Sequence, residues 1–215
     1  MSFTLYHYVH CPFCIRVRMA LGFLNLNYDS KVLAYNDEVT PINLTGKKML
    51  PAFTFEKITI NESLDIISLV DTEKKLNVHQ LIYSSTYADL EKLLNELSEP
   101  LHSLTMPYWI YTPEFNDDSR SYFRLKKEHK RGPFNDLVKN QTLYIAKLMP
   151  FLNLIEEKLN PFYESLEFGL KDILIASHLW GLYIVPEFQF SEKMHAYLQT
   201  VKIKCHFNYH QDFWS

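Results

Sequence analysis

Two cysteines three positions apart, Cys11 and Cys14, are the residues of this chain best suited to carry chemistry. An apolar run over residues 3–9 precedes them, and apolar residues recur over residues 15–24. The pattern predicts a strand, a turn and a helix, with Cys11 at the mouth of the helix and Cys14 in its first turn. Unpaired backbone N–H groups and the positive end of the helix dipole stabilise an anion there, and the anion on offer is a thiolate.

This arrangement favours thiol–disulfide exchange. A free cysteine has a pKa of about 8.5, whereas cysteines at helix N-termini and in Cys-X-X-Cys motifs fall to roughly 3.5–7.5. Arg16 and Arg18 act in the same direction if their side chains turn toward the sulfur. The alternative is a pair of buried, inert cysteines.

Composition narrows the class of protein. The chain has 215 residues, 47% of them hydrophobic, and a net charge of -3, which argues against an extended nucleic-acid surface. We expect no transmembrane helix and no signal peptide. Three cysteines cannot form a disulfide framework, so a reducing cytoplasm fits best, and there a Cys-X-X-Cys is metal-binding or catalytic.

The chain divides into two parts with different patterns. In residues 1–75, strand signals follow at 28–33, 52–56 and 58–60, and helix signals at 40–44 and 63–73. From residue 79 onward only helical spacing remains. The apolar faces are Ile82, Thr86, Leu90, Leu93 and Leu97, then Ile145, Leu148, Leu152, Ile155 and Leu159, then Ile173, Ala176, Trp180 and Ile184, with a last helix near residues 190–204. We therefore predict an α/β domain over 1–75, a linker at 74–78 and an all-helical domain over 79–215.

Three motifs together carry a resemblance to a known family. They are Cys11-Pro12-Phe13-Cys14, the Leu50-Pro51 pair, and Glu62-Ser63 at the start of a predicted helix. With the helical second half, where residues 121–128 and 134–137 match as well, the chain resembles the large bacterial glutaredoxin 2 family. The resemblance implies a thioredoxin-like domain followed by an all-α domain, as in glutathione S-transferases.

The resemblance also implies roles for named residues. Cys11 would attack a disulfide as the thiolate, Cys14 would resolve the mixed disulfide, and glutathione would be the co-substrate. Pro51 resembles the cis-proline that turns the Leu50 backbone toward the cysteines; the alternative is a trans proline that starts a strand.

Further positions resemble the family's glutathione contacts. Glu62 and Ser63 match the position for the γ-glutamyl group, where a carboxylate takes the ammonium and the helix N-terminus takes the carboxylate. The alternative is helix capping by Asn61 or Ser63. Lys48 would take the glycyl carboxylate; a solvated surface lysine is the alternative. Tyr8 and His10 flank the motif without an assigned role.

Other signals have simpler explanations. Cys205, His206 and His210 lie too far from the motif to complete a zinc site with it, so we expect no metal and a Cys205 thiol packed among aromatic rings. The basic run Arg124, Lys126, Lys127, Lys130 and Arg131 predicts a solvated helix face. His178 is expected to be a core histidine. Gly169 stands at the cap position before Asp172, where serine or threonine is common.

The prediction from sequence is a cytoplasmic, monomeric dithiol glutaredoxin that reduces glutathione mixed disulfides and protein disulfides. Its partners would be glutathione and disulfide-containing or glutathionylated proteins, without nucleic acid or membrane. One alternative is a cysteine-type glutathione transferase or dehydroascorbate reductase, which would not need Cys14. Another is a non-catalytic thioredoxin-like protein whose motif senses redox state or holds an iron–sulfur cluster.

Overall fold

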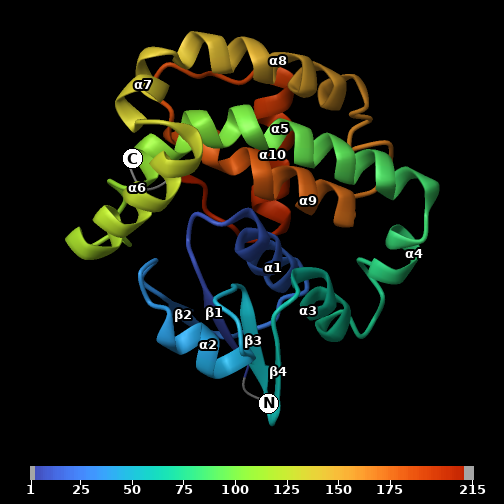
Figure 1. Cartoon of the computed structure of the whole chain (residues 1–215). Helices are drawn as coiled ribbons and strands as arrows, with labels where there is room; N and C mark the ends of the chain where they lie inside the picture. Colours follow the sequence, from blue (N-terminus) through green and yellow to red (C-terminus); the bar gives the residue numbers. More distant parts are fainter. Residues whose placement is uncertain (1–2, 211–215) are drawn as a thin grey trace.

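A four-stranded mixed sheet organises the N-terminal part of the computed structural model, which describes residues 3–210 (Figure 1). The strand order is β2-β1-β3-β4. β1 (Phe3–His7) pairs parallel with β2 (Asp29–Val32) and antiparallel with β3 (Ala52–Phe55), which pairs antiparallel with β4 (Ile58–Ile60). The first strand is two residues shorter than the apolar run that predicted it.

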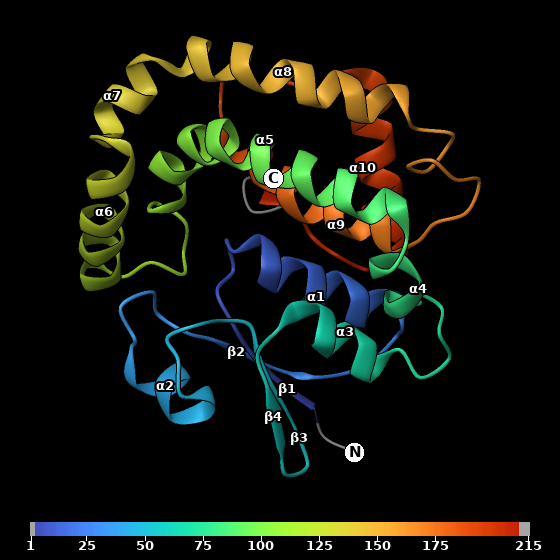
Figure 2. The same cartoon turned by 45° about the vertical axis from the view of Figure 1, so that its right-hand side comes forward.

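Three helices complete this domain: α1 (Pro12–Phe23), α2 (Val39–Thr45) and α3 (Ser63–Val70). α1 packs against α3 and lies between the sheet and the helical half (Figure 2). The order β-α-β-α-β-β-α confirms the predicted thioredoxin-like domain.

α3 ends earlier than predicted, at Val70 instead of residue 73. The reason is Asp71, whose buried carboxylate accepts hydrogen bonds from three backbone N–H groups of the following loop. The donors are Lys75, Leu76 and Asn77, each at 2.8 Å. These bonds hold the linker in a tight loop that cannot continue the helix.

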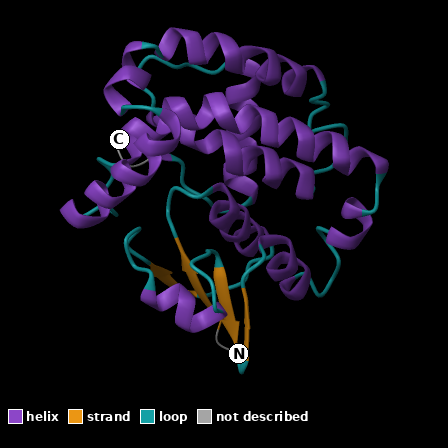
Figure 3. Cartoon of the chain, viewed as in Figure 1, coloured by secondary structure: helices purple, strands orange, loops and turns teal. Residues whose placement is uncertain are grey.

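The second half is entirely helical in the described residues (Figure 3). Its elements are α4 (Val78–Ile82), α5 (Ser85–Trp109), α6 (Asp117–Arg131), α7 (Phe134–Lys139), α8 (Gln141–Glu157), α9 (Leu170–Leu179), the 3-10 helix η1 (Trp180–Ile184) and α10 (Glu192–Lys204). The fold class is therefore the predicted α/β domain followed by an all-α domain. The boundaries at 1–75 and 79–215 stay a prediction.

Three details of the predicted helical faces were wrong. The face that began at Ile82 and Thr86 is split between α4 and α5 at Tyr83 and Ser84, where the Ser84 hydroxyl donates to Leu81 O. Leu159 lies beyond the end of α8. The helix predicted through Ile184 changes to 3-10 geometry after Leu179.

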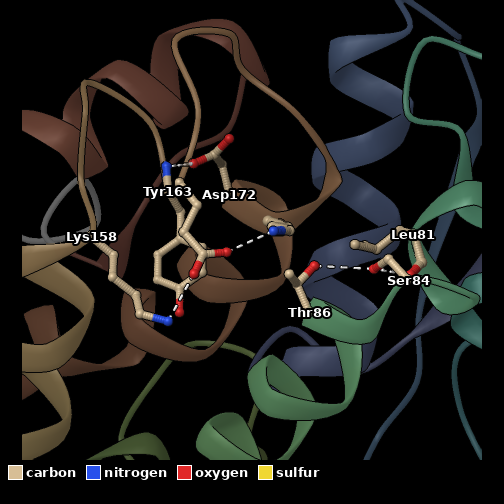
Figure 4. A network of polar contacts seen from close by, with 8 residues as sticks. Leu81, Ser84, Thr86, Lys158, Tyr163 and Asp172 are labelled. Carbon is tan, nitrogen blue, oxygen red and sulfur yellow. Dashed lines mark hydrogen bonds and ion pairs between the residues drawn. The ribbon is translucent and has the colours of Figure 1, made fainter.

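The start of α9 follows the sequence closely. The Asp172 side chain accepts the Gly169 N–H at 2.9 Å, so the expected cap forms with glycine. Asp172 also accepts from the Tyr163 N–H at 2.9 Å (Figure 4). The Tyr197 hydroxyl donates to the same carboxylate at 2.9 Å. The buried carboxylate thereby ties the loop before α9 and helix α10 to the centre of the helical domain.

Candidate active site

Cys11 and Cys14 lie where the sequence placed them. Cys11 is the N-cap residue of α1 with an extended backbone, and Pro12 occupies the first turn, where its missing N–H costs no hydrogen bond. Cys11 is half-buried, Cys14 is fully buried, and both thiols are free. The first thiol is thus the more accessible of the two.

The two thiols differ in acidity. A hydrogen bond from the Cys14 thiol lowers the pKa of Cys11 to about 7, opposed by burial and helped by the backbone N–H groups of Cys14 and Phe13 and by the Arg16 charge. Burial, together with the Cys11 sulfur, raises the pKa of Cys14 well above its usual value. Arg18 stacks over the Phe207 ring instead, so of the two arginines only Arg16 turns toward Cys11 as proposed.

The Leu50–Pro51 peptide bond is cis, as the family resemblance implied, and not trans. Leu50 and Ala52 pack with Cys14 in a small buried cluster, against which Cys11 and Tyr8 are partly buried. The segment that leads into β3 therefore lies beside the cysteine motif.

The start of α3 has no side-chain cap. Glu62 is the N-cap residue, its side chain is exposed, and it makes no capping hydrogen bond. Within residues 3–210 its carboxylate also has no ion pair. Ser63 is buried. Neither Asn61 nor Ser63 is the cap, so that alternative was wrong, and the first N–H groups of α3 keep no side-chain partner.

Lys48 does not extend into solvent. Its Nζ lies 2.9 Å from Glu38 Oε1 and 2.7 Å from the hydroxyl of Tyr122, a residue of α6 in the helical domain. Tyr122 also donates to Glu38. The Tyr122 hydroxyl and the Glu38 carboxylate raise the pKa of Lys48 against the effect of partial burial. Sequence reasoning missed Glu38 and Tyr122, because 84 positions separate them and no local pattern connects them.

Aromatic rings surround the residue before Cys11. His10 is buried among the rings of Tyr8, Tyr35, Trp109, Phe115 and Phe123. Burial lowers its pKa to about 3, so the imidazole is neutral at physiological pH. His10 therefore contributes shape and apolar surface to the site.

The basic run of α6 is only partly a solvated face. Lys127 is half-buried, with its Nζ 5.5 Å from the ring centroids of both Tyr35 and Phe123. Burial lowers the pKa of Lys127, while the Cys11 sulfur acts in the opposite direction. No local pattern in the sequence indicates that Lys127 turns toward the cysteine motif.

Cys205 and His178, for which the sequence predicted no catalytic role, are both buried. Cys205 is buried beside aromatic rings, and burial raises the pKa of its thiol. His178 is buried, with Nδ1 2.9 Å from Leu174 O. The described residues contain no group of three His, Cys, Asp or Glu side chains that could hold a metal ion. None of the helices within residues 3–210 is long and apolar enough to cross a membrane.

A cavity of about 340 Å³ lies between α4 and the loop before α9. Part of its wall is seen in Figure 4, where Ser84 and Thr86 face the loop around Tyr163. It contains none of the site residues predicted from the sequence.

Comparison with known proteins places the chain in a family. Residues 89–212, more than half of the chain, match the family model described as the glutaredoxin 2 C-terminal domain. The chain belongs to the glutaredoxin 2 family. Residues 5–77 match the model of the glutathione S-transferase N-terminal domain.

Individual relatives agree with this assignment. Glutaredoxin 2 of Escherichia coli K12 is 29% identical over 157 residues, covering 71% of this chain and 72% of the relative. The crystal structure of glutaredoxin 2 from Salmonella typhimurium in complex with glutathione superposes with a TM-score of 0.85 at 26% identity, covering 98% of this chain and 97% of the other. A glutathione transferase from Phanerochaete chrysosporium, at 15% identity and a TM-score of 0.77 over 95% and 97% of the two chains, shares the fold alone.

Proposed function

We propose that this glutaredoxin 2 family member is a glutathione-dependent thiol–disulfide oxidoreductase that uses Cys11 as nucleophile. The observation that carries the proposal is the difference between the two thiols: the accessible Cys11 has a pKa of about 7, while Cys14 is buried and held protonated. The lowered pKa increases the share of Cys11 that is thiolate at neutral pH, and the thiolate is the species that attacks a disulfide.

The reaction proceeds by two exchanges. The Cys11 thiolate attacks the glutathionyl sulfur of a mixed disulfide, so that a Cys11–glutathione disulfide forms and the substrate leaves as a thiolate. A second glutathione thiolate then attacks that disulfide, releasing glutathione disulfide and the Cys11 thiolate. With protein disulfides, Cys14 gives up its proton and attacks the Cys11 mixed disulfide, which frees the substrate and leaves a Cys11–Cys14 disulfide for glutathione to reduce.

Glutathione would bind along the residues that flank the cysteines. The backbone of Leu50 before Pro51 supplies hydrogen-bonding groups for the cysteinyl part. Glu62 takes the γ-glutamyl ammonium, and Ser63 with the free N–H groups of α3 takes the γ-glutamyl carboxylate. Lys48 takes the glycyl carboxylate once that anion displaces Glu38. The glutathione complex of the Salmonella typhimurium relative supports this choice of ligand.

The proposal is tested by glutathione-coupled reduction of a small glutathione mixed disulfide. Wild type should be active, Cys11→Ser should be inactive, and Cys14→Ser should keep substantial activity with the small substrate but lose reduction of a protein disulfide. A folded but inactive wild type would overturn the proposal. If Cys14→Ser matched wild type on protein disulfides as well, the cysteine-type transferase or dehydroascorbate reductase would replace it. We also propose that the protein is a monomer and that it acts in the cytoplasm.

A further inference from the structure

Arg16 is a buried cation that forms no ion pair within the described part of the chain. It lies in α1, its side chain is only 7% exposed, and its Nε has no hydrogen-bond partner within residues 3–210. None of the described carboxylates approaches it within ion-pair distance. Its guanidinium lies 4.5 Å from the centroid of the Phe13 ring. Burial lowers the pKa of Arg16, and the charges of Tyr87, Cys11 and Glu91 offset this only in part. Because a buried charge without an ion pair is costly, a small anion that entered from solvent would stabilise the guanidinium.

The guanidinium lines a small cavity beside the cysteine motif. Its volume is about 50 Å³, and residues of α1, α5 and α9 form the walls. The lining includes Phe13, Arg16, Tyr87, Glu91, Asn95 and His178. One water molecule needs roughly 15 Å³, so the space accommodates a carboxylate group but not a tripeptide.

We propose that this cavity is a subsite in which Arg16 binds a carboxylate carried by the thiol or disulfide that exchanges with Cys11. The inference rests on the proposed function. Arg pairs with carboxylates through two parallel N–H···O bonds, which suits a single small anion. The residues proposed for glutathione, Leu50 and Ser63, come from other elements, so the subsite serves the second reactant.

The other polar groups of the cavity influence how strongly Arg16 would bind a carboxylate. Asn95 is exposed and offers an amide donor, and the Tyr87 hydroxyl donates to Glu91 Oε1 at 3.4 Å. His178 directs Nδ1 to the Leu174 carbonyl, and burial lowers its pKa to about 3, so the ring is neutral. Glu91 lies at the exposed rim, and its negative charge opposes an incoming carboxylate. The two charged residues of the cavity thus act in opposite directions.

The test isolates one exchange step. A Cys14→Ser protein is loaded with glutathione at Cys11 and mixed with 3-mercaptopropionate or with neutral 2-mercaptoethanol. The incoming thiolate attacks the glutathionyl sulfur, a new disulfide between thiol and glutathione forms, and Cys11 leaves as thiolate. The quantity measured is the ratio of the two rates. Any effect of Arg16 on the leaving Cys11 thiolate influences both thiols alike and cancels in this ratio.

The expected results have opposite signs for the two variants. In Arg16→Met, which keeps the volume of the side chain, the ratio should fall about tenfold, and Arg16→Lys should restore part of it. In Glu91→Gln, at an exposed position that tolerates substitution, the ratio should rise. A ratio unchanged in both variants would overturn the subsite while the exchange itself continues. Absence of exchange in the loaded protein would instead overturn the proposed function.

The source of the carboxylate is decided by two further pairs of thiols. Glutathione and its dimethyl ester test the second glutathione as the reactant. Cysteine peptides with a neighbouring aspartate or asparagine test an acidic protein substrate. The pair whose rate ratio depends on Arg16 identifies the reactant, and dependence in neither pair would contradict the subsite.

Discussion

Gly22 of α1 lies directly against the backbone of Cys205, at the C-terminal end of α10. A Cβ atom at position 22 would lie 1.9 Å from the Cys205 carbonyl oxygen, a distance that no real Cβ contact tolerates. The contact is between main chains, so no side-chain rotation can relieve it. Gly22 therefore sets how closely the helix that carries the active-site cysteines approaches the C-terminal helix.

We predict that Gly22→Ala lowers the free energy of unfolding by about 1–3 kcal/mol, because α1 must move away from α10. This loss outweighs the higher helix propensity of alanine. Urea unfolding followed by circular dichroism measures the change. The control is Gly169→Ala, where a Cβ would have no neighbour within 4 Å, and we expect a loss below about 1 kcal/mol. Equal losses in the two variants would contradict the role of the contact.

This contact marks the limit of what the sequence predicts. The cysteine motif, the succession of strands and helices along the first domain and the main helices follow from local patterns, because hydrophobic periodicity and turn residues act over a few positions. Gly22 and Cys205 come together only in the folded chain, and a glycine in a helix gives no local sign of what it faces. In the candidate site, Tyr122 and Glu38 are likewise far apart in the sequence and meet only in the folded chain. Asp71 ended α3 through bonds to a loop that helical periodicity does not describe.

The start of α3, where Glu62 makes no capping hydrogen bond, leads to a prediction about glutathione. Glu62→Gln should raise the KM for glutathione about tenfold, since the charge-assisted hydrogen bond to the γ-glutamyl ammonium is lost. The measurement is the glutathione dependence of mixed-disulfide reduction. Asp65→Asn removes another exposed carboxylate from the first turn of α3 and should have a much smaller effect. Equal shifts in the two variants would show that only the general charge of the region matters.

The Glu38–Lys48 pair should act against glutathione. Glu38→Gln removes the carboxylate that competes for Lys48, so the KM for glutathione should fall by roughly two- to fivefold, as an ion pair of this exposure permits. Glu73→Gln breaks another exposed pair, with Lys75, and should leave the KM unchanged. A higher KM in Glu38→Gln would indicate that Glu38 positions Lys48 for binding instead of blocking it.

The acidity of Cys11 should depend on its neighbour. Iodoacetamide alkylation of Cys11 in wild type should titrate with a pKa of about 7, the reaction becoming faster as pH rises through that value. Cys14→Ala removes the thiol whose hydrogen bond contributes most to the low pKa, so the midpoint should move upward. Cys205→Ala is the control, since that thiol is buried away from the motif, and it should leave the midpoint in place. A wild-type midpoint above about 8 would remove the electrostatic argument for Cys11.

Two buried histidines predict loss of stability in acid. Burial lowers the pKa of His10 and of His178 to about 3, whereas histidine in an unfolded chain has a pKa of about 6.5. Between these values the unfolded state binds more protons than the folded state, so the free energy of unfolding decreases as pH falls below about 6.5, by about 1.4 kcal/mol per pH unit for each histidine. Urea unfolding at a series of pH values measures the slope. His178→Gln should make the slope shallower, while His129→Gln, on the exposed face of α6, should not. An unchanged slope in His178→Gln would mean that other groups cause the acid sensitivity.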